Sequence, residues 1–484
     1  MTNRSDTARP APGPDCPVPL VPGSAFPDGR LVVAGPPGPA PGTADTGCPE
    51  GPGRTGSGPD PDGAVAFVPS GGGWTPGRYA ALRREHGSVA PVVLAGGVRA
   101  WLVLGYAEVA HVTGHDELFA RDAPGPGPWP GADGGPGAGA ATDVRRVPSV
   151  ARALESVDHF ELAQGCRRIA QHLIDAFAGS GRAELMTAYA RSLSLRAAVL
   201  MCGLPPGAEA TEGLVRDLGT ALAGDGEPVA GRTEQDRPER DRPERNRPGG
   251  DGPGGRKRSV ARGDEAVAAY VRAGERVRRL VAARRAAPGP DVVSGLLADP
   301  AGATDEEVTR QVLGLVAAAC RPTADWIGNT LRLLLTDERF ARDVSGGRLS
   351  VGEALNGVLW LDTPVQLAAG RRARRDTRLG GRGIRAGDRV VPGLGAANTD
   401  PGIWPDGRAG AENAAHLSFG GGVHRCPYPA PLLADVMART AVETLLEQLP
   451  DTVLAEEAAE PSWRLSVRSR GLVALPVRFT PVVR

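Results

Sequence analysis

The pattern of apolar and polar positions predicts helices along most of the chain. Apolar side chains recur at the spacing of one face of an amphipathic helix in many long segments. The predicted helices are 146–156, 159–178, 183–203, 209–223, 264–286, 305–337, 350–361 and 430–449. So many long helices predict a mainly α-helical fold.

Short strands are predicted only toward the two ends of the folded region. Residues 90–95 and 100–105 are apolar runs, and the Gly pair between them suits a hairpin turn. The segment 378–392 also reads as short strands and glycine turns. Within it, "GRGIRA" at 381–386 matches a dinucleotide-binding pattern, but no strand and helix flank it, so it predicts a hairpin turn. The β portion is therefore minor.

Composition divides the chain into a tail and one folded domain. The 68 Gly and 46 Pro are concentrated in segments that lack apolar periodicity and cannot bury a core. We expect residues 1–72 to form a disordered Pro/Gly-rich tail and 73–484 to form the folded domain. Low-complexity insertions are expected at 123–141 and 225–263, the second being charged and proline-rich.

Charge and cysteine usage exclude several classes of protein. The formal net charge is zero, so nothing indicates a nucleic-acid partner or a membrane surface. No run approaches the ~20 apolar residues that a membrane-spanning helix needs, and the N-terminus lacks an apolar leader. The six cysteines include no C-x-x-C pair, which favours a reducing compartment. We expect a soluble, cytoplasmic protein.

The stretch "SFGGGVHRCPYPAP" at 418–431 carries the strongest chemical signal. It places one cysteine, Cys426, between a run of glycines and the start of a helix. A thiolate is a soft metal ligand, and a helix N-terminus favours the anionic form. With no second cysteine or acidic ligand nearby, zinc is disfavoured. A lone cysteine beside a turn is also compatible with a small buried side chain and no ligand.

The surrounding residues favour a ligand, because the stretch resembles the heme-binding loop of the cytochromes P450, F-G-x-G-x-H-x-C-x-G, although Tyr428 stands in place of the last glycine. The residues in register are Phe419, Gly420, Gly422, His424 and Cys426. This resemblance implies a P450 fold with heme b, in which Cys426 is the proximal iron ligand and Phe419 lies near the sulfur. It also implies that His424 and Arg371 contact the heme propionates. The resemblance covers roughly residues 73–484. Sequence segments such as "HRCPYPAP" resemble those of soluble P450s of actinobacterial conservons.

Three other motifs of the family are altered. The E-x-x-R positions hold Gly357 and Trp360, and we expect Trp360 to compensate by packing. Conservon P450s resemble this sequence in lacking that motif. The C-helix H-x-x-x-R positions hold Asp143 and Val147, although the arginines at 145–146 could still reach a propionate.

The oxygen-activating acid–alcohol pair of the family aligns with Arg321 and Pro322, and Thr323 comes one position later. We take these three as the candidate catalytic residues. An arginine stays charged and cannot relay a proton as a carboxylate does. A proline removes an amide donor and bends the helix.

The resemblance implies a heme-thiolate monooxygenase that inserts one oxygen atom from O2 into a small organic substrate. Its implied partners are a ferredoxin and a ferredoxin reductase, with Arg425 on the docking face. One alternative is a peroxide-driven hydroxylase whose Arg321 binds a substrate carboxylate. Another is a catalytically degenerate heme-binding sensor.

Overall fold

The computed structural model describes residues 65–66, 75–94, 97–121, 147–223, 253–300, 302–404, 413–455, 461–464, 466 and 468–482. All of them belong to one unit that runs from Gly56 to Arg484. The expected insertion at 123–141 lies outside these residues, as does nearly all of the expected tail. Val65–Ala66 is an exception, because it forms strand β1, so the boundary at residue 72 is placed too late.

The helices follow the apolar periodicity closely. The predicted ones are α3 (Val147–Glu155), α4 (His159–Ala178), α5 (Ser192–Met201), α6 (Glu209–Leu222), α7 (Pro253–Ala286), α9 (Asp305–Thr336), α11 (Val351–Leu361) and α13 (Ala430–Gln448). Two more, α1 (Pro76–His86) and α2 (Tyr106–Gly114), flank the N-terminal strands. The short helices α8 (Val292–Leu297), α10 (Glu338–Ser345) and α12 (Leu394–Asn398) were not predicted, because they span too few turns to show a period.

Two helix boundaries differ from the prediction. The expected helix 183–203 is divided into a strand, β5 (Arg182–Glu184), a π-helical turn (Met186–Arg191) and α5. Helix α7 begins at Pro253 and not at 264, so residues 253–263 belong to a helix and the expected insertion 225–263 ends too late. A proline in the first turn suits a helix start, although Gly254 and Gly255 follow it.

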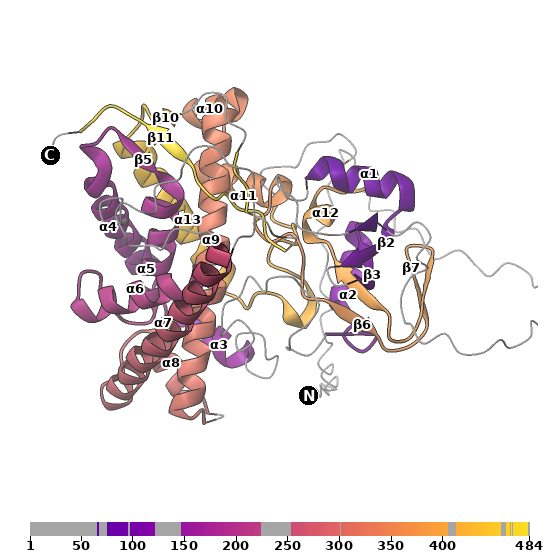
Figure 1. Cartoon of the computed structure of the whole chain (residues 1–484), viewed down its shortest axis with the longest axis horizontal. Coiled ribbons are helices and arrows are strands. Elements are labelled where there is room, and N and C mark those ends of the chain that lie inside the picture. Colours follow the sequence, from indigo (N-terminus) through magenta and orange to yellow (C-terminus); the bar gives the residue numbers. More distant parts are fainter. Residues whose placement is uncertain are drawn as a thin grey trace, which may run out of the picture. The chain divides into compact units, whose positions relative to one another are not determined.

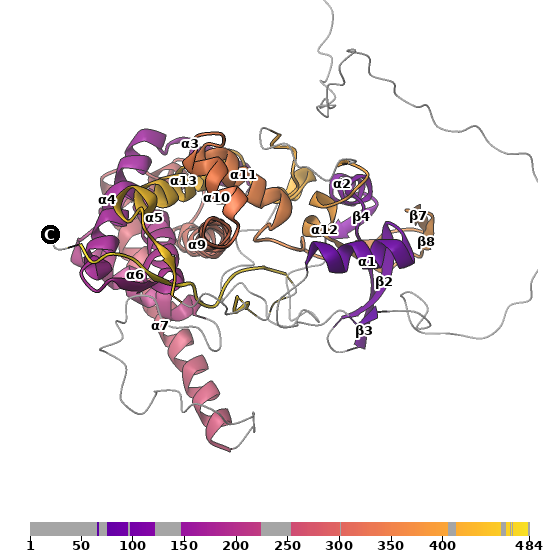
Figure 2. The same cartoon turned by 90° about the horizontal axis from the view of Figure 1, so that it is seen from above.

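Helix α9 is the centre of the helical part. Its N-terminus is closed by a capping box between Thr304 and Glu307, and Pro322 lies inside it. Helices α5, α7, α10, α11 and α13 all pack against it, and Figure 2 shows α9 nearly end-on among them. Its buried residues join two apolar cores, one shared with α5 and α7 and the other with α11 and α13.

The strands of the main sheet lie on the other side of α9 from α4–α6 (Figure 1). The main sheet has the order β1–β2–β3–β9–β6–β4, built from β2 (Val89–Leu94), β3 (Val98–Val103), β9 (Arg389–Pro392), β6 (Arg371–Ala373) and β4 (Phe119–Arg121). Strands β2 and β3 form the predicted hairpin, in register Val92 to Ala100. Strands β10 (Val453–Leu454) and β11 (Pro476–Arg478) pair with β5.

The "GRGIRA" segment is a hairpin, as predicted. Strands β7 (Thr377–Leu379) and β8 (Arg382–Ile384) pair antiparallel around Gly380 and Gly381, which both have positive φ. Among the described residues, no helix combines the length and the apolar character needed to span a membrane.

Candidate functional site

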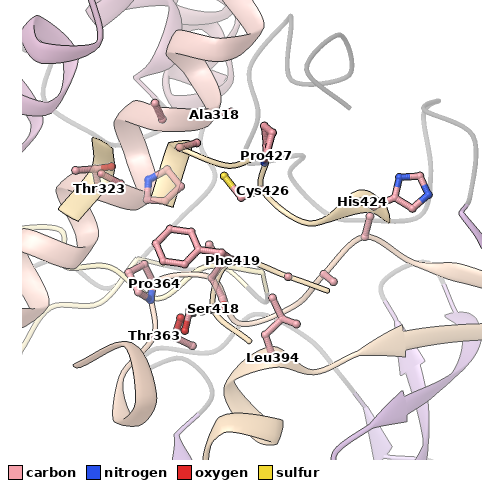
Figure 3. Close-up of a pocket in the computed structure, with 18 of the residues that line it drawn as sticks. Ala318, Thr323, Thr363, Pro364, Leu394, Ser418, Phe419, His424, Cys426 and Pro427 are labelled. Atoms are coloured by element: carbon pink, nitrogen blue, oxygen red, sulfur yellow. Dashed lines mark hydrogen bonds between the residues drawn. The ribbon is translucent and has the colours of Figure 1, made fainter. Parts of the chain in front are cut away.

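A cavity of about 330 Å³ lies between α9, the start of α13 and the loop that carries Cys426. Strand β6 and the segment 363–369 also contribute to its wall. The residues of α9 that face it are Gln311, Leu315, Ala318, Ala319, Pro322, Thr323 and Trp326. Figure 3 shows Thr323 and Ala318 of α9 on one side, with Phe419 and Cys426 of the loop opposite. The cavity therefore brings together segments that are about a hundred residues apart in the sequence.

Cys426 and Phe419 both lie on the cavity wall (Figure 3). The Cys426 amide donates a hydrogen bond to the Phe419 carbonyl over 2.8 Å, which closes the loop. Burial raises the pKa of the Cys426 thiol to about 11. An anionic sulfur at this position therefore requires a positive partner such as a metal ion.

The glycines of the loop have separate roles. Gly420 lines the cavity and has a φ of 78°. Gly422 is not among the residues that line the cavity. A Cβ on Gly422 would lie 1.8 Å from the Thr113 carbonyl oxygen, and its φ is 66°. Gly422 is needed to pack the loop against the end of α2.

A cationic cluster lies at one end of the cavity. Arg371, on β6, is only 2% exposed, and its Nε and Nη1 atoms have no hydrogen-bond partner. Its Nη1 lies 3.4 Å from Asp116 Oδ1, and His424 Nε2 lies 2.5 Å from Asp116 Oδ2. Arg121 Nη1 is 3.4 Å from His424 Nδ1. Burial lowers the pKa values of Arg371 and His424, so this end of the cavity favours an additional anion.

The three candidate catalytic residues are consecutive on α9, but only two of them line the cavity. Pro322 and Thr323 line the cavity. Arg321 is not among the lining residues, and its Nη2 donates to the Leu222 carbonyl 2.5 Å away, at the end of α6. The structure therefore does not place Arg321 where it would bind a substrate carboxylate, and the peroxide-driven alternative loses the residue on which it depends.

These side chains fit an iron porphyrin. The cavity offers a sulfur ligand, an apolar wall on α9, and at one end a buried arginine whose Nε and Nη1 atoms make no hydrogen bond, with Asp116 Oδ1 3.4 Å from Nη1. A porphyrin carboxylate would supply an acceptor for these donors. Among the described residues, no group of three or more His, Cys, Asp and Glu side chains could hold a metal ion.

No family model matches the chain. The chain is 28% identical to mycinamicin IV hydroxylase/epoxidase from Micromonospora griseorubida, over 83% of this chain and 94% of that protein. It is 33% identical to cytochrome P450 105C1 from Streptomyces sp, with 57% of that protein covered, and 30% identical to PksS from Bacillus subtilis, with 51% covered. These last two matches span little more than half of the relatives' length.

Solved structures give the same result over nearly the whole fold. The ligand-free crystal structure of wild-type CYP105P1 superposes with a TM-score of 0.68 at 25% identity, covering 86% of this chain and all of that one. The F286A mutant of MycG superposes with a TM-score of 0.66 at 27% identity. The chain belongs to the cytochrome P450 family. The predicted family and the mainly α-helical P450 fold are confirmed.

The cytochromes P450 bind heme b, and the residues that the resemblance implies for its iron and propionates lie at this cavity. Cys426 would hold the iron, while Arg371 and His424 would bind propionates. Arg121, Arg468 and Asp116 are additional residues at this cavity or its cationic end that sequence reasoning missed. The only feature of the sequence that could have indicated Arg121 is its position as a basic residue at the end of a short apolar run. The arginines at 145–146, considered for the same role, lie outside the described residues.

Trp360 connects α11 to the segment that precedes the cysteine loop. It is 1% exposed, and its Nε1 donates to the Asn413 carbonyl over 2.6 Å. Its ring packs edge-on against Trp404, with 4.7 Å between ring centroids. The resemblance implies an arginine at position 360. In this chain, the packing of the Trp360 ring and its one hydrogen bond connect α11 to the segment before the cysteine loop.

Proposed function

We propose that this P450 is a heme-thiolate monooxygenase that inserts one oxygen atom from O2 into a small organic substrate. The observation that carries the proposal is the position of Cys426 opposite Pro322 and Thr323, across one apolar cavity. A thiolate-ligated heme supplies the electron density at iron that favours O–O cleavage. The protein's own residues hold this group, exclude water and orient the substrate.

The lining residues support an apolar substrate. Most of them are aliphatic. The arginines among them, Arg121, Arg371 and Arg468, lie at the cationic end of the cavity or outside its α9 wall. The substrate would therefore be oriented mainly by shape against α9 and α12. The names of similar proteins, such as mycinamicin IV hydroxylase/epoxidase, describe those proteins' substrates, and they favour an organic molecule here.

Thr323 is the residue we propose for proton handling. Among the described α9 residues on the cavity wall, it carries the only hydroxyl group. It is 4% exposed, so its hydroxyl lies away from bulk water. Pro322, one position earlier, has neither a hydroxyl nor an amide hydrogen. Thr323 would thus provide the hydroxyl group at the distal wall, and Arg321 would have no part in this step.

A ferredoxin, reduced by a ferredoxin reductase, is the proposed electron donor. Arg425 is exposed immediately beside Cys426, so a cation lies close to the point where electrons must enter. An acidic partner would be attracted to this face.

The reduced, carbon monoxide-bound absorption spectrum tests the proposed function. We expect the red-shifted Soret band of a thiolate-ligated heme in the wild type and its complete loss in Cys426→Ala. Cys320→Ser, which changes a buried cysteine of α9 that does not line the cavity, should retain the band. An unchanged band in Cys426→Ala would refute the proposal. Oxygen-dependent product formation with reduced ferredoxin then separates an enzyme from a heme-binding sensor.

A further inference from the structure

A row of aromatic side chains leads from the cavity toward the segment before the cysteine loop. We call these residues the aromatic row: Trp326, Phe419, His416, Trp360 and Trp404. The centroids of successive rings are 6.1 Å apart for Trp326–Phe419, 5.8 Å for Phe419–His416, 5.7 Å for His416–Trp360 and 4.7 Å for Trp360–Trp404. Each ring is therefore close to the next, although the residues come from α9, α11 and two separate loops.

The two ends of the row differ in their surroundings. Trp326 and Phe419 line the cavity, and the Phe419 carbonyl accepts the hydrogen bond of the Cys426 amide. Trp326 is 3% exposed and Trp360 is 1% exposed, so both indoles are shielded from water. Trp404, at the other end, is only half-buried. The row thus connects the sulfur ligand's surroundings with a side chain that solvent can reach.

We propose that the aromatic row carries single electrons from Trp404 to the cavity, so that an oxidising equivalent left at the heme site is moved out to Trp404. The proposal rests on the proposed function. Indole is oxidised more easily than phenyl or imidazole, so the tryptophans are the sites that would lose electrons. Phe419 and His416 fill the space between them. His416 is neutral, because burial lowers its pKa to about 4, so no cation in the row opposes a positive charge on an indole.

The step balances with hydrogen peroxide as the oxidant. Hydrogen peroxide takes up two electrons and two protons to give two water molecules. Trp404 supplies two electrons in two one-electron steps and releases two protons as its ring gains one oxygen atom from water, which accounts for one peroxide and gives the oxidised Trp404. Both indole N–H groups donate to backbone carbonyls, that of Trp404 to Asn398 over 3.2 Å and that of Trp360 to Asn413 over 2.6 Å. Trp404 is suited to be the final donor because it is half-buried and can lose protons to water, whereas Trp360 is 1% exposed.

The cavity itself shows why such an outlet would be useful. No Asp or Glu is among the described residues that line it, and Thr323 is the hydroxyl on the α9 wall. Proton delivery from carboxylates beside the substrate is therefore absent from the described lining. An oxidising equivalent that is not used on substrate would remain near Cys426 and Phe419 unless electrons reach it from elsewhere in the protein.

The test treats the heme-loaded, substrate-free protein with hydrogen peroxide. Rapid-freeze electron paramagnetic resonance should show a tryptophan radical, and peptide mass spectrometry should find oxidised Trp404. In Trp404→Phe both signals should be lost and the heme should bleach faster. Trp404→Tyr should restore the slower bleaching and give a tyrosyl radical, which a purely structural role of the ring would not produce.

Trp101→Phe is the matched control. Trp101 is also half-buried and hydrogen-bonded, through Nε1 to Asp388 Oδ2 at 3.0 Å, but it is not part of the row. It should leave the radical signal and the bleaching rate unchanged. Equal radical yield and equal bleaching in the wild type and Trp404→Phe would overturn the inference. If the wild type forms the thiolate Soret band but shows neither the tryptophan radical nor oxidised Trp404, electron transfer through the aromatic row is refuted while the proposed function stands.

Discussion

Arg371 shows how a single buried charge can reveal a missing partner. Its side chain is almost inaccessible to water, and one carboxylate, Asp116, must serve both Arg371 and His424. Its Nε and Nη1 atoms make no hydrogen bond, although Nη1 lies 3.4 Å from Asp116 Oδ1. A buried donor without an acceptor costs free energy, and an anionic group in the cavity would remove that cost. The resemblance implies that Arg371 binds a propionate, and this role stays a prediction.

Replacing Arg371 with Met should weaken heme binding. A hydrogen bond to a charged group contributes about 1.5–3 kcal/mol, so we expect heme affinity to fall by roughly ten- to a hundredfold. Heme transfer to an excess of apomyoglobin measures the change. Arg372→Met is the control, because Arg372 is the next residue on β6 and its Nη1 donates to the Gly387 carbonyl. Equal losses in the two variants would contradict the assigned role of Arg371.

At the scale of elements, the position of the cysteine loop depends on its contact with α2. Gly421 and Gly422 both approach Thr113, near the C-terminal end of that helix, more closely than a side chain allows. The loop is also bonded internally, from Cys426 to Phe419. A change at this contact should therefore displace the sulfur.

Gly422→Ala should be more destabilising than Gly381→Ala. Both glycines have positive φ, 66° and 78°, which costs an alanine about 1–2 kcal/mol. Only Gly422 also meets a backbone oxygen, whereas Gly381 has nothing within 4 Å of its Cβ position. Chemical denaturation gives the free energy of unfolding of each variant, and Gly422→Ala should also lose the thiolate Soret band. Similar free energies for the two would argue against a tight contact with Thr113.

The contact between α6 and α7 should depend on pH. Burial by itself would raise the pKa of Asp217, but hydrogen bonds from Arg272 Nε at 2.9 Å and Arg276 Nε at 2.7 Å outweigh it and lower the pKa. A lowered pKa in the folded state stabilises the protein above the ordinary value of 3.8, and the stabilisation is lost as the pH falls through the folded value.

Asp217→Asn should therefore lower the melting temperature near neutral pH, and the difference from the wild type should shrink in acid. Thermal unfolding at a series of pH values measures this difference. Asp305→Asn is a suitable control, because Asp305 also pairs with an arginine, Arg285, but that pair is exposed and water screens it. A wild-type advantage that grows on acidification would have the wrong sign for this mechanism.

At the scale of the whole molecule, the two apolar cores of the helical part both end at the cavity. Ala430, Leu433 and Met437 of α13 are shared between one core and the cavity wall, and Trp326 and Phe419 between the other core and that wall. A group bound in the cavity would thus contact both cores at once. Its binding should stabilise the folded chain as a unit.

Removal of heme should lower the thermal stability of the whole protein. A ligand present at a hundred times its dissociation constant stabilises the folded state by about 2.7 kcal/mol. Calorimetry of the heme-free protein, before and after addition of hemin, should show the melting temperature rise with hemin concentration. The same addition to Cys426→Ala should give a smaller rise. Identical melting temperatures with and without hemin would show that the cavity does not bind it.

The sequence by itself determined most of the helices and the chemical centre of this protein. Helix α4 begins and ends at the predicted residues, because apolar periodicity is a local property that each segment displays independently. The loop around Cys426 was recognisable for the same reason, since its glycines, histidine and cysteine lie within a few positions of one another.

Only the tertiary structure decided which distant groups meet. It turned Arg321 toward Leu222 and away from the cavity, brought Asp116 to His424 and Arg371, and aligned the aromatic row. It also placed Gly422 against Thr113. These pairings join residues far apart in the chain, and they depend on how helices and loops pack, which no local pattern of residues records.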